Sequence, residues 1–131
     1  MAKVAFYEKP GCLGAARQKQ ALRRAGHEVN EHDLLSEPWT AARLKSFFGA
    51  RPVADWFNRS APRVKSGEIA PERLGEEAAL ALMLADPLLI RRPLLQSGDR
   101  REVGFEPALI EAWLGLDPAA AIPSEGCPRD R

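Results

Sequence analysis

The sequence predicts a single α/β domain in which helices cover a small sheet. Three observations carry this prediction. A short apolar strand ends in a turn that leads directly to Cys12 and a helix, and a second strand follows that helix. A strand–helix–strand unit of this length requires parallel pairing through a right-handed crossover. The 131 residues suffice for one hydrophobic core and contain no internal repeat.

The N-terminal segments form the first half of this sandwich. Residues 2–8 alternate loosely between apolar and polar side chains, and Pro10-Gly11 ends the run, which indicates a short buried strand. Residues 13–25 have a helix-forming composition with a narrow apolar face, and Gly26 is a C-terminal stop. Residues 27–33 follow as the second strand.

A helical insert is expected at about residues 38–86. Thr40 is a suitable N-cap for a helix with apolar residues at i, i+3 and i+4. Residues 62–69 are polar, and Lys65-Ser66-Gly67 within them suggests an exposed loop. Gly75 opens a helix whose body, residues 78–85, is apolar nearly all round, so it should be buried on most sides.

The second half of the sandwich follows the insert. Residues 88–95 have the apolar character of a strand, interrupted by two arginines and a proline. Gly98-Asp99 makes a hairpin-type turn into a further strand at residues 102–105. Pro107 can start a last helix whose apolar residues cover the sheet, namely Leu109, Ile110, Trp113 and Leu114.

Composition and net charge indicate how the chain is divided and which kinds of binding partner it lacks features for. Residues 1–116 are expected to form the single domain, and residues 117–131, rich in Pro, Ala, Gly and charge, a flexible tail. A net charge of +1 provides no overall field for nucleic acid or an anionic membrane. No apolar stretch could span a bilayer and no signal segment is present, so we expect a cytoplasmic protein. His27 and His32 have no cysteine at ligand spacing, so no metal site is predicted.

Cys12 is the first candidate functional residue. A thiol at a helix N-terminus sees unsatisfied N–H donors and the positive end of the helix dipole, which can lower its pKa from about 8.5 to roughly 3.5–7.5. The same donors can hold an oxyanion. The alternative is a packed apolar cysteine without reactivity. The second cysteine, Cys127, is either a resolving thiol or an incidental residue of the tail.

The order of these elements is that of a thioredoxin-like domain, and three segments resemble one family with that fold. They are Lys9-Pro10-Gly11-Cys12, the insert around residues 44–84, and Asp86-Pro87-Leu88-Leu89-Ile90-Arg91-Arg92-Pro93, which is similar to a pattern of aliphatic residues followed by Arg-Pro. The chain up to about Leu116 thereby resembles the arsenate reductase family, which also contains the Spx-type transcription regulators.

Three further segments are similar to a nitrogenase-associated subgroup of this family, found beside nitrogen-fixation genes. They are Ala16-Arg17-Gln18-Lys19 after Cys12, Trp56-Phe57-Asn58-Arg59, and Val64-Lys65-Ser66-Gly67-Glu68-Ile69. This narrower resemblance implies a protein partner linked to nitrogenase.

The resemblance implies roles for individual residues. Cys12 matches the nucleophile that takes arsenate in the reductases, and Arg92 matches the arginine before a cis proline. Pro93 would then face Cys12. The implied anion-binding residues are Gly11 and Pro93 beside the thiol, with Arg17 and Arg59 as further candidates. No cofactor is expected to be bound, and glutathione with glutaredoxin is the implied external reductant.

The sequence departs from the reductase pattern at two arginine positions. Asn58 stands at one of them, with Arg59 beside it, and Phe105 stands at the other. Arg17 lies one position later than the helix arginine of the reductases. Because each hydrogen bond to a charged group contributes about 1.5–3 kcal/mol, losing two arginines would weaken oxyanion binding by several powers of ten.

Two classes of function remain open. One is a thiol-dependent oxidoreductase in which Cys12 attacks a small oxyanion or a mixed disulfide with glutathione, Arg92 stabilises negative charge, and an external thiol resolves the adduct. The other is a non-catalytic accessory or regulatory protein on the same fold, which docks on nitrogen-fixation or other protein partners. The retained Cys12 and Arg92-Pro93 favour the enzyme, and the missing arginines favour the accessory protein.

Overall fold

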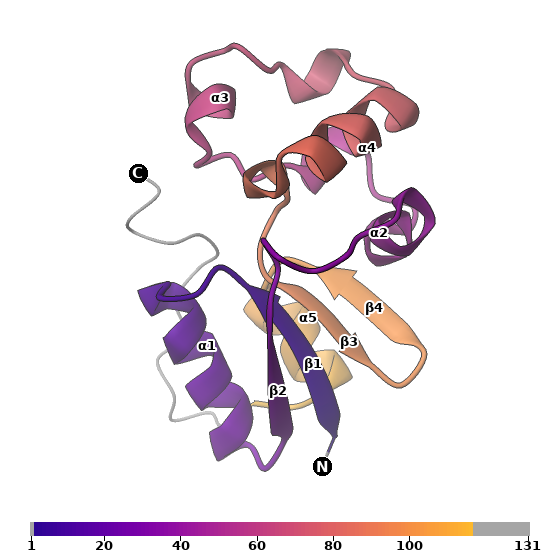
Figure 1. Cartoon of the computed structure of the whole chain (residues 1–131). Coiled ribbons are helices and arrows are strands. Elements are labelled where there is room, and N and C mark those ends of the chain that lie inside the picture. The colour runs from indigo at the N-terminus through magenta and orange to yellow at the C-terminus, as the bar shows by residue number, and fades with distance from the viewer. Residues whose placement is uncertain (1, 117–131) are drawn as a thin grey trace.

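The computed structural model describes residues 2–116, which adopt a thioredoxin-like α/β fold (Figure 1). Strands and helices alternate at both ends of the chain, and a long helical segment lies between them. In chain order, with η for short 3-10 helices, the elements are β1 (Lys3–Glu8), α1 (Leu13–Arg24), β2 (Glu28–Asp33), α2 (Ala41–Phe48), η1 (Val53–Trp56), α3 (Pro62–Lys65), η2 (Pro71–Arg73), α4 (Glu76–Ala85), η3 (Pro87–Leu89), β3 (Leu94–Ser97), β4 (Arg100–Val103) and α5 (Pro107–Trp113).

The sheet has the strand order β2-β1-β3-β4. β1 and β2 are parallel, with Val4 opposite Val29, and α1 makes the crossover between them, which confirms the predicted unit. β3 pairs antiparallel with both β1 and β4. β1 is therefore a central strand, and it is joined to β3 only after the chain has passed through the whole helical segment.

Alternation along β1 divides the core into two clusters, one on each face of the sheet. Val4 and Phe6 pack with α1 and α5 on one face, together with Leu22, Leu95 and Ile110. Figure 1 shows α1 and α5 beside the sheet and α2, α3 and α4 gathered at one end of it. The second cluster joins this helical segment to the sheet and contains Tyr7, Leu44, Phe47, Trp56, Phe57, Met83, Ile90 and Leu94.

The predicted helix boundaries in the first half of the chain are confirmed. Thr40 caps α2, and its Oγ1 accepts a hydrogen bond from the Arg43 backbone N–H at 3.2 Å. α1 ends at Arg24 with Ala25 as C-cap, and Gly26 has the positive φ of 94° that a helix stop favours. The last helix also lies where Pro107 predicted it, with Ile110 fully buried against the sheet.

The loop expected at Lys65-Ser66-Gly67 is exposed, and it continues from the end of the one-turn helix α3, which Pro62 starts. The prediction that the next helix is buried on most sides is wrong. α4 is buried on one face only, through Ala79 and Met83, while Leu84 is 39% exposed. The alanines of this helix carry little apolar surface, so its outer face can remain in water although few of its residues are polar.

The predicted strand at residues 88–95 is also wrong in its first half. Pro87–Leu89 form η3, Ile90 makes an isolated bridge with Phe57, and β3 begins only at Leu94. The Arg92–Pro93 peptide bond is cis, as the resemblance implies. Because proline has no N–H for a sheet ladder, regular pairing starts after Pro93.

Two further predictions concern the C-terminal tail and membrane-spanning segments. The tail at residues 117–131, and Cys127 within it, lie outside the described residues. Across residues 2–116, no helix combines the length and the apolar character needed to cross a bilayer.

Candidate functional site

The sheet brings Cys12 and Arg92 together although eighty positions of sequence separate them. Tyr7 of β1 lies opposite Leu94 of β3, so the turn after β1 and the residues before β3 meet at the same end of the sheet. Cys12 follows the first of these segments, and Arg92-Pro93 forms the second.

Cys12 occupies the N-cap position of α1. Its backbone N–H donates to the Lys9 carbonyl at 3.3 Å, which closes the turn, and Gly11 has the φ of 83° that this turn requires. The Ala16 N–H donates to the Cys12 carbonyl at 3.1 Å, the first bond of the helix. The first turn of α1 contains no acidic residue. The half-buried thiol therefore lies where the helix dipole favours a thiolate.

A small pocket surrounds the thiol and contains the predicted partners of Cys12. Its volume is about 10 Å³, which is room for roughly one water-sized group. Arg92 is only 7% exposed, so its charge is little screened by water. The lining residues are Glu8, Lys9, Cys12, Ala15, Gln18, Arg92 and Pro93.

Glu8 brings a buried carboxylate to the same pocket. The residue is 8% exposed, and its Oε1 accepts a hydrogen bond from Lys19 Nζ at 2.7 Å. Lys19 also donates to Glu31 on β2. Burial lowers the pKa of Lys19, but its hydrogen bonds to Glu31 and Glu8 outweigh this and hold that pKa above its usual value. Lys19 is therefore a permanent cation between two carboxylates.

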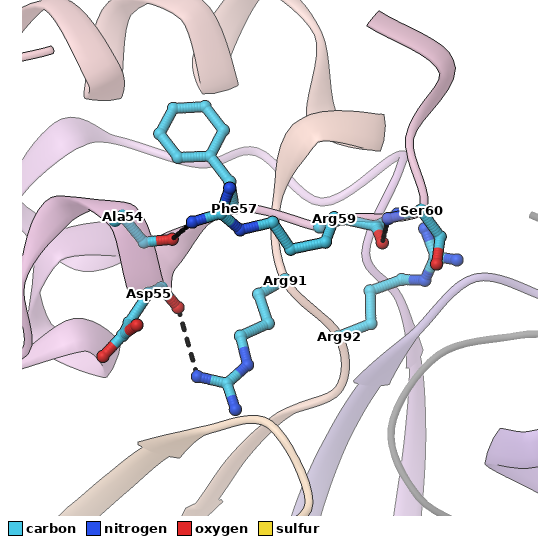
Figure 2. Close-up of a pocket in the computed structure, with 8 residues that line it drawn as sticks. Ala54, Asp55, Phe57, Arg59, Ser60, Arg91 and Arg92 are labelled. Carbon is cyan, nitrogen blue, oxygen red and sulfur yellow. Dashed lines mark hydrogen bonds between the residues drawn. The ribbon is translucent and has the colours of Figure 1, made fainter. Parts of the chain in front are cut away.

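A second, larger cavity of about 340 Å³ lies between the helical insert and the residues before β3. Figure 2 shows Arg59, Arg91 and Arg92 around it, with Arg91 Nη1 donating to the Asp55 carbonyl at 3.2 Å. Arg92 lines both this cavity and the Cys12 pocket. The two spaces thus share one lining residue.

The structure brings together only part of the predicted site. Cys12, Arg92 and Pro93 line one pocket, and Gly11 shapes the turn beside it. Arg59 instead lines the larger cavity, where it is exposed and forms an ion pair of 2.7 Å with Glu72. The remaining candidate, Arg17, is exposed on α1 and does not line either space.

Asn58 and Phe105, which stand at the two unmatched arginine positions, have structural contacts. The Asn58 amide donates to the Leu88 carbonyl at 3.3 Å, and its Oδ1 accepts from the Ser60 N–H at 3.0 Å. Phe105 is 1% exposed and packs in the cluster under α1 and α5. Neither position offers a cation to a bound oxyanion.

Sequence reasoning assigned no role to four residues that line these spaces. Lys9, Glu8 and Gln18 surround the thiol, and Arg91 lies in the larger cavity. Glu8 had one available signal, since it is a charged residue at the last position of a strand predicted to be buried. The 2% exposure of Gln18 could be inferred only from its position three residues after Ala15 and four before Leu22, on the buried face of α1.

Within the described residues, His, Cys, Asp and Glu side chains form no cluster of three or more that could hold a metal ion. The polar groups around Cys12 are instead two cations, one carboxylate and one amide. Such an arrangement can stabilise a thiolate and bind a ligand that carries charge of both signs.

Comparison with known proteins gives relatives over nearly the whole chain. An uncharacterised 15.7 kDa protein in the draG 3′ region of Rhodospirillum rubrum is 51% identical, over 98% of this chain and 90% of its own. The global transcriptional regulator Spx of Streptococcus pyogenes serotype M6 is 23% identical, over 87% of each chain.

Solved structures agree with this relationship. An ArsC family related protein from Bacteroides fragilis superposes with a TM-score of 0.72 and 25% identity, over 84% of this chain and 97% of its own. An arsenate reductase from Vibrio cholerae has a TM-score of 0.71 at 20% identity, over 85% and 97%, which shows a shared fold. The family model of ArsC matches residues 8–113, from the end of β1 to the end of α5. The chain therefore belongs to the ArsC family.

Proposed function

We propose that this protein is a thiol-dependent oxidoreductase that uses Cys12 as its single reactive thiol. The observation that carries the proposal is the shared pocket of Cys12, Arg92 and Pro93, at the N-terminus of a twelve-residue helix. The helix dipole and the buried guanidinium both favour negative charge on the sulfur. A thiolate is the species that attacks disulfides and oxidised substrates.

The substrate class is a small oxyanion or a mixed disulfide with glutathione. Asn58 and Phe105 supply no arginine, which favours the mixed disulfide over a dianion that needs several charged donors. The thiolate of Cys12 attacks one sulfur and forms a new S–S bond, while the old S–S bond breaks and its electron pair leaves on the departing thiolate. A second, external thiol then attacks the adduct and restores Cys12, so glutathione or glutaredoxin supplies the electrons.

The decisive measurement is the pKa of Cys12, from the pH dependence of alkylation by iodoacetamide in a Cys127→Ser background. We expect a value below about 7.5 that rises towards the ordinary thiol value of about 8.5 in Arg92→Ala. Arg91→Ala is the matched control, because Arg91 is the neighbouring arginine but lines only the larger cavity. The proposal fails if the Cys12 thiol has an ordinary pKa that Arg92→Ala leaves unchanged.

The second candidate function is a non-catalytic accessory or regulatory protein that docks on partners linked to nitrogen fixation. Burial of Phe105 favours it, because one arginine position of the reductase site has become part of the core. The nitrogenase-associated subgroup is similar to this chain at residues 16–19, 56–59 and 64–69. This similarity supports a partner linked to nitrogenase. The 51% identical relative of Rhodospirillum rubrum is described by its position in the draG 3′ region, which is consistent with a role tied to neighbouring genes.

This alternative is tested by affinity capture from nitrogen-fixing cells that contain the tagged full-length chain. Retention of the same partner by Cys12→Ser and wild type would support docking independent of thiol chemistry. Loss of capture in Cys12→Ser would assign the interaction to the thiol and favour the oxidoreductase.

A further inference from the structure

Glu8 Oε2 is a buried acceptor with no hydrogen-bond partner among residues 2–116. The other oxygen, Oε1, is bound by Lys19 at 2.7 Å, so the carboxylate is fixed in place. A buried acceptor of this kind costs free energy unless a ligand donates to it. Glu8 also lines the pocket that contains Cys12. These facts point to a ligand that forms a bond to Cys12 through a sulfur atom and carries an N–H donor close to that sulfur.

The charges around the pocket come from four segments. Glu8 ends β1, Lys9 follows in the turn, Lys19 reaches Glu8 from α1, and Arg92 precedes β3. Glu31 on β2 also forms an ion pair with Lys19 but does not line the pocket. A ligand at Cys12 therefore meets cations at Lys9 and Arg92 and an anion at Glu8. A dianion would be attracted by the first two and repelled by the third.

The pocket also limits the size of the group that enters it. With a volume of about 10 Å³, it has room for roughly one donor group of the size of a water molecule. In cysteine-type thiols the nitrogen is two carbon atoms from the sulfur. A sulfur bonded to Cys12 would thus leave an ammonium or amide N–H near Glu8.

We propose that Glu8 is a specificity-determining residue that selects disulfides of aminothiols, in which an N–H donor lies two carbons from the sulfur. The inference rests on the proposed thiol chemistry of Cys12 and specifies its substrate. In the exchange step, Cys12 Sγ bonds to the aminothiol sulfur and the second half of the disulfide leaves as a thiolate. Glu8 Oε2 accepts the N–H of the bound half, while a carboxylate on the ligand is matched by Arg92 and Lys9.

The test compares two disulfide reagents of opposite charge, cystamine and dithiodipropionate, on Cys127→Ser protein. Mass spectrometry follows the mixed disulfide at Cys12 over time. The thiolate fraction of Cys12 affects both rates equally, so the ratio of the cystamine rate to the dithiodipropionate rate isolates the selectivity. In Glu8→Gln we expect this ratio to fall by about tenfold, the effect of removing one nearby charge at low dielectric.

Glu31→Gln is the matched control, because it removes the other carboxylate bound to Lys19 from outside the pocket. Its rate ratio should stay within about twofold of wild type, as expected for an exposed charge screened by water. Lys19→Gln is a second variant with the opposite expectation, since it leaves the Glu8 charge uncompensated and should raise the ratio. Circular dichroism checks that each variant retains its fold, and Lys19→Gln decides the matter if Glu8→Gln does not fold.

The outcomes separate this inference from the proposed function. A ratio that neither Glu8→Gln nor Lys19→Gln changes, with rapid exchange at Cys12, overturns the role of Glu8 and leaves the thiol chemistry standing. Exchange at Cys12 no faster than that of an unstructured cysteine peptide overturns both. Opposite shifts of the ratio in the two variants, with Glu31→Gln unchanged, establish Glu8 as the selective group.

Discussion

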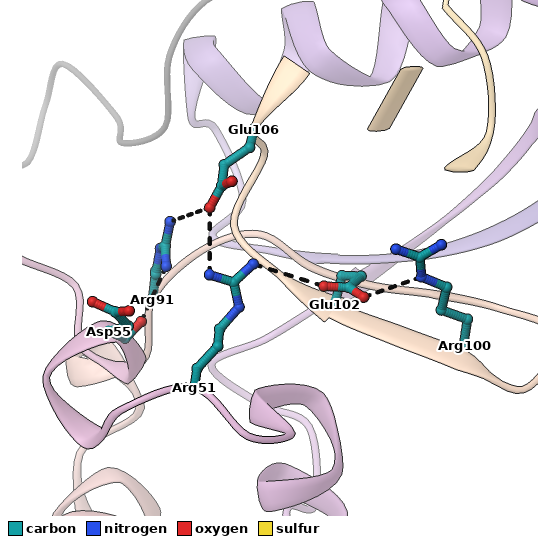
Figure 3. A network of polar contacts seen from close by, with 6 residues as sticks. All are labelled: Arg51, Asp55, Arg91, Arg100, Glu102 and Glu106. Carbon is teal, nitrogen blue, oxygen red and sulfur yellow. Dashed lines mark hydrogen bonds and ion pairs between the residues drawn. The ribbon is translucent and has the colours of Figure 1, made fainter. Parts of the chain in front are cut away.

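Arg51 Nη1 lies 3.4 Å from Glu106 Oε1, which links the helical insert to the start of α5 (Figure 3). Arg51 Nη2 also lies 3.8 Å from Glu102 on β4. The same Glu106 oxygen lies 3.6 Å from Arg91 Nη2, so one carboxylate contacts both an arginine of the insert and an arginine that lines the larger cavity. Arg100 completes the network by pairing with Glu102 at 3.1 Å.

We expect Arg51→Gln to lower the free energy of unfolding by about 1 kcal/mol, the upper range for ion pairs near a surface. Arg51 and Glu102 are both partly buried, and Arg51 contacts two carboxylates. Urea denaturation measures the change. Arg59→Gln is the control, because its pair with Glu72 is exposed and lies within the insert. An equal loss in both variants would show that the network does not tie the insert to the sheet.

We expect Phe105→Arg to destabilise the fold by about 3–5 kcal/mol, because it removes a packed ring and buries a charge without a partner. Restoring the arginine of the reductase pattern is thus predicted to disrupt the core under α1 and α5. Phe105→Leu, which retains apolar volume, should cost about 1.5 kcal/mol or less. Thermal denaturation followed by circular dichroism compares the two. A stable Phe105→Arg protein that binds arsenate would contradict the structural role given to Phe105.

The ion pair of Lys19 with Glu31 should contribute stability that depends on pH. The hydrogen bond from Lys19 lowers the pKa of Glu31, so this carboxylate binds its proton less readily in the folded than in the unfolded chain. Its contribution is present above the unfolded value of about 4.3 and is lost as pH falls through the lower folded value. Glu31→Gln should therefore lose less than about 1 kcal/mol at pH 7, because Glu31 is half exposed. Urea denaturation should find wild type and variant converging below about pH 4, and a constant difference would contradict this origin.

Thr40→Ala should destabilise the protein by about 1 kcal/mol, because it removes the oxygen that accepts the Arg43 N–H at the start of α2. Ser46→Ala, in the exposed part of the same helix, should change stability by less than about 0.5 kcal/mol. Chemical denaturation of both variants provides the comparison. Equal effects would mean that the cap contributes nothing specific.

The fold could be predicted largely from local signals. Pro10-Gly11, Gly26, Thr40 and Pro107 each mark a boundary through backbone geometry or capping, and all four lie at the expected places. The one-sided burial of α4 could not be predicted, because an alanine-rich helix has almost no pattern to distinguish its faces.

The candidate site was predictable where it lies near a boundary signal and not where it depends on burial. Cys12 is identified by its place after a strand and before a helix, and Arg92 by the resemblance around Pro93. Glu8 and the environment of Phe105 depend on which side chains the sheet and α5 enclose. For Phe105 that information comes from contacts between distant segments, which no local pattern records, whereas Glu8 had only the signal of a charged residue at the end of a buried strand.

The pairing of β1 with β3 has a consequence for how the thiol pocket comes into being. β1 and β2 are joined by a single helix, whereas β1 and β3 pair only after most of the described chain has been enclosed as a loop between them. Closing so long a loop carries an entropic cost that contacts made elsewhere must offset. A chain in which this pairing is absent holds Cys12 on its helix but has no arginine beside it. The surroundings of one sulfur atom therefore depend on whether two strands that are separated by most of the described chain have paired.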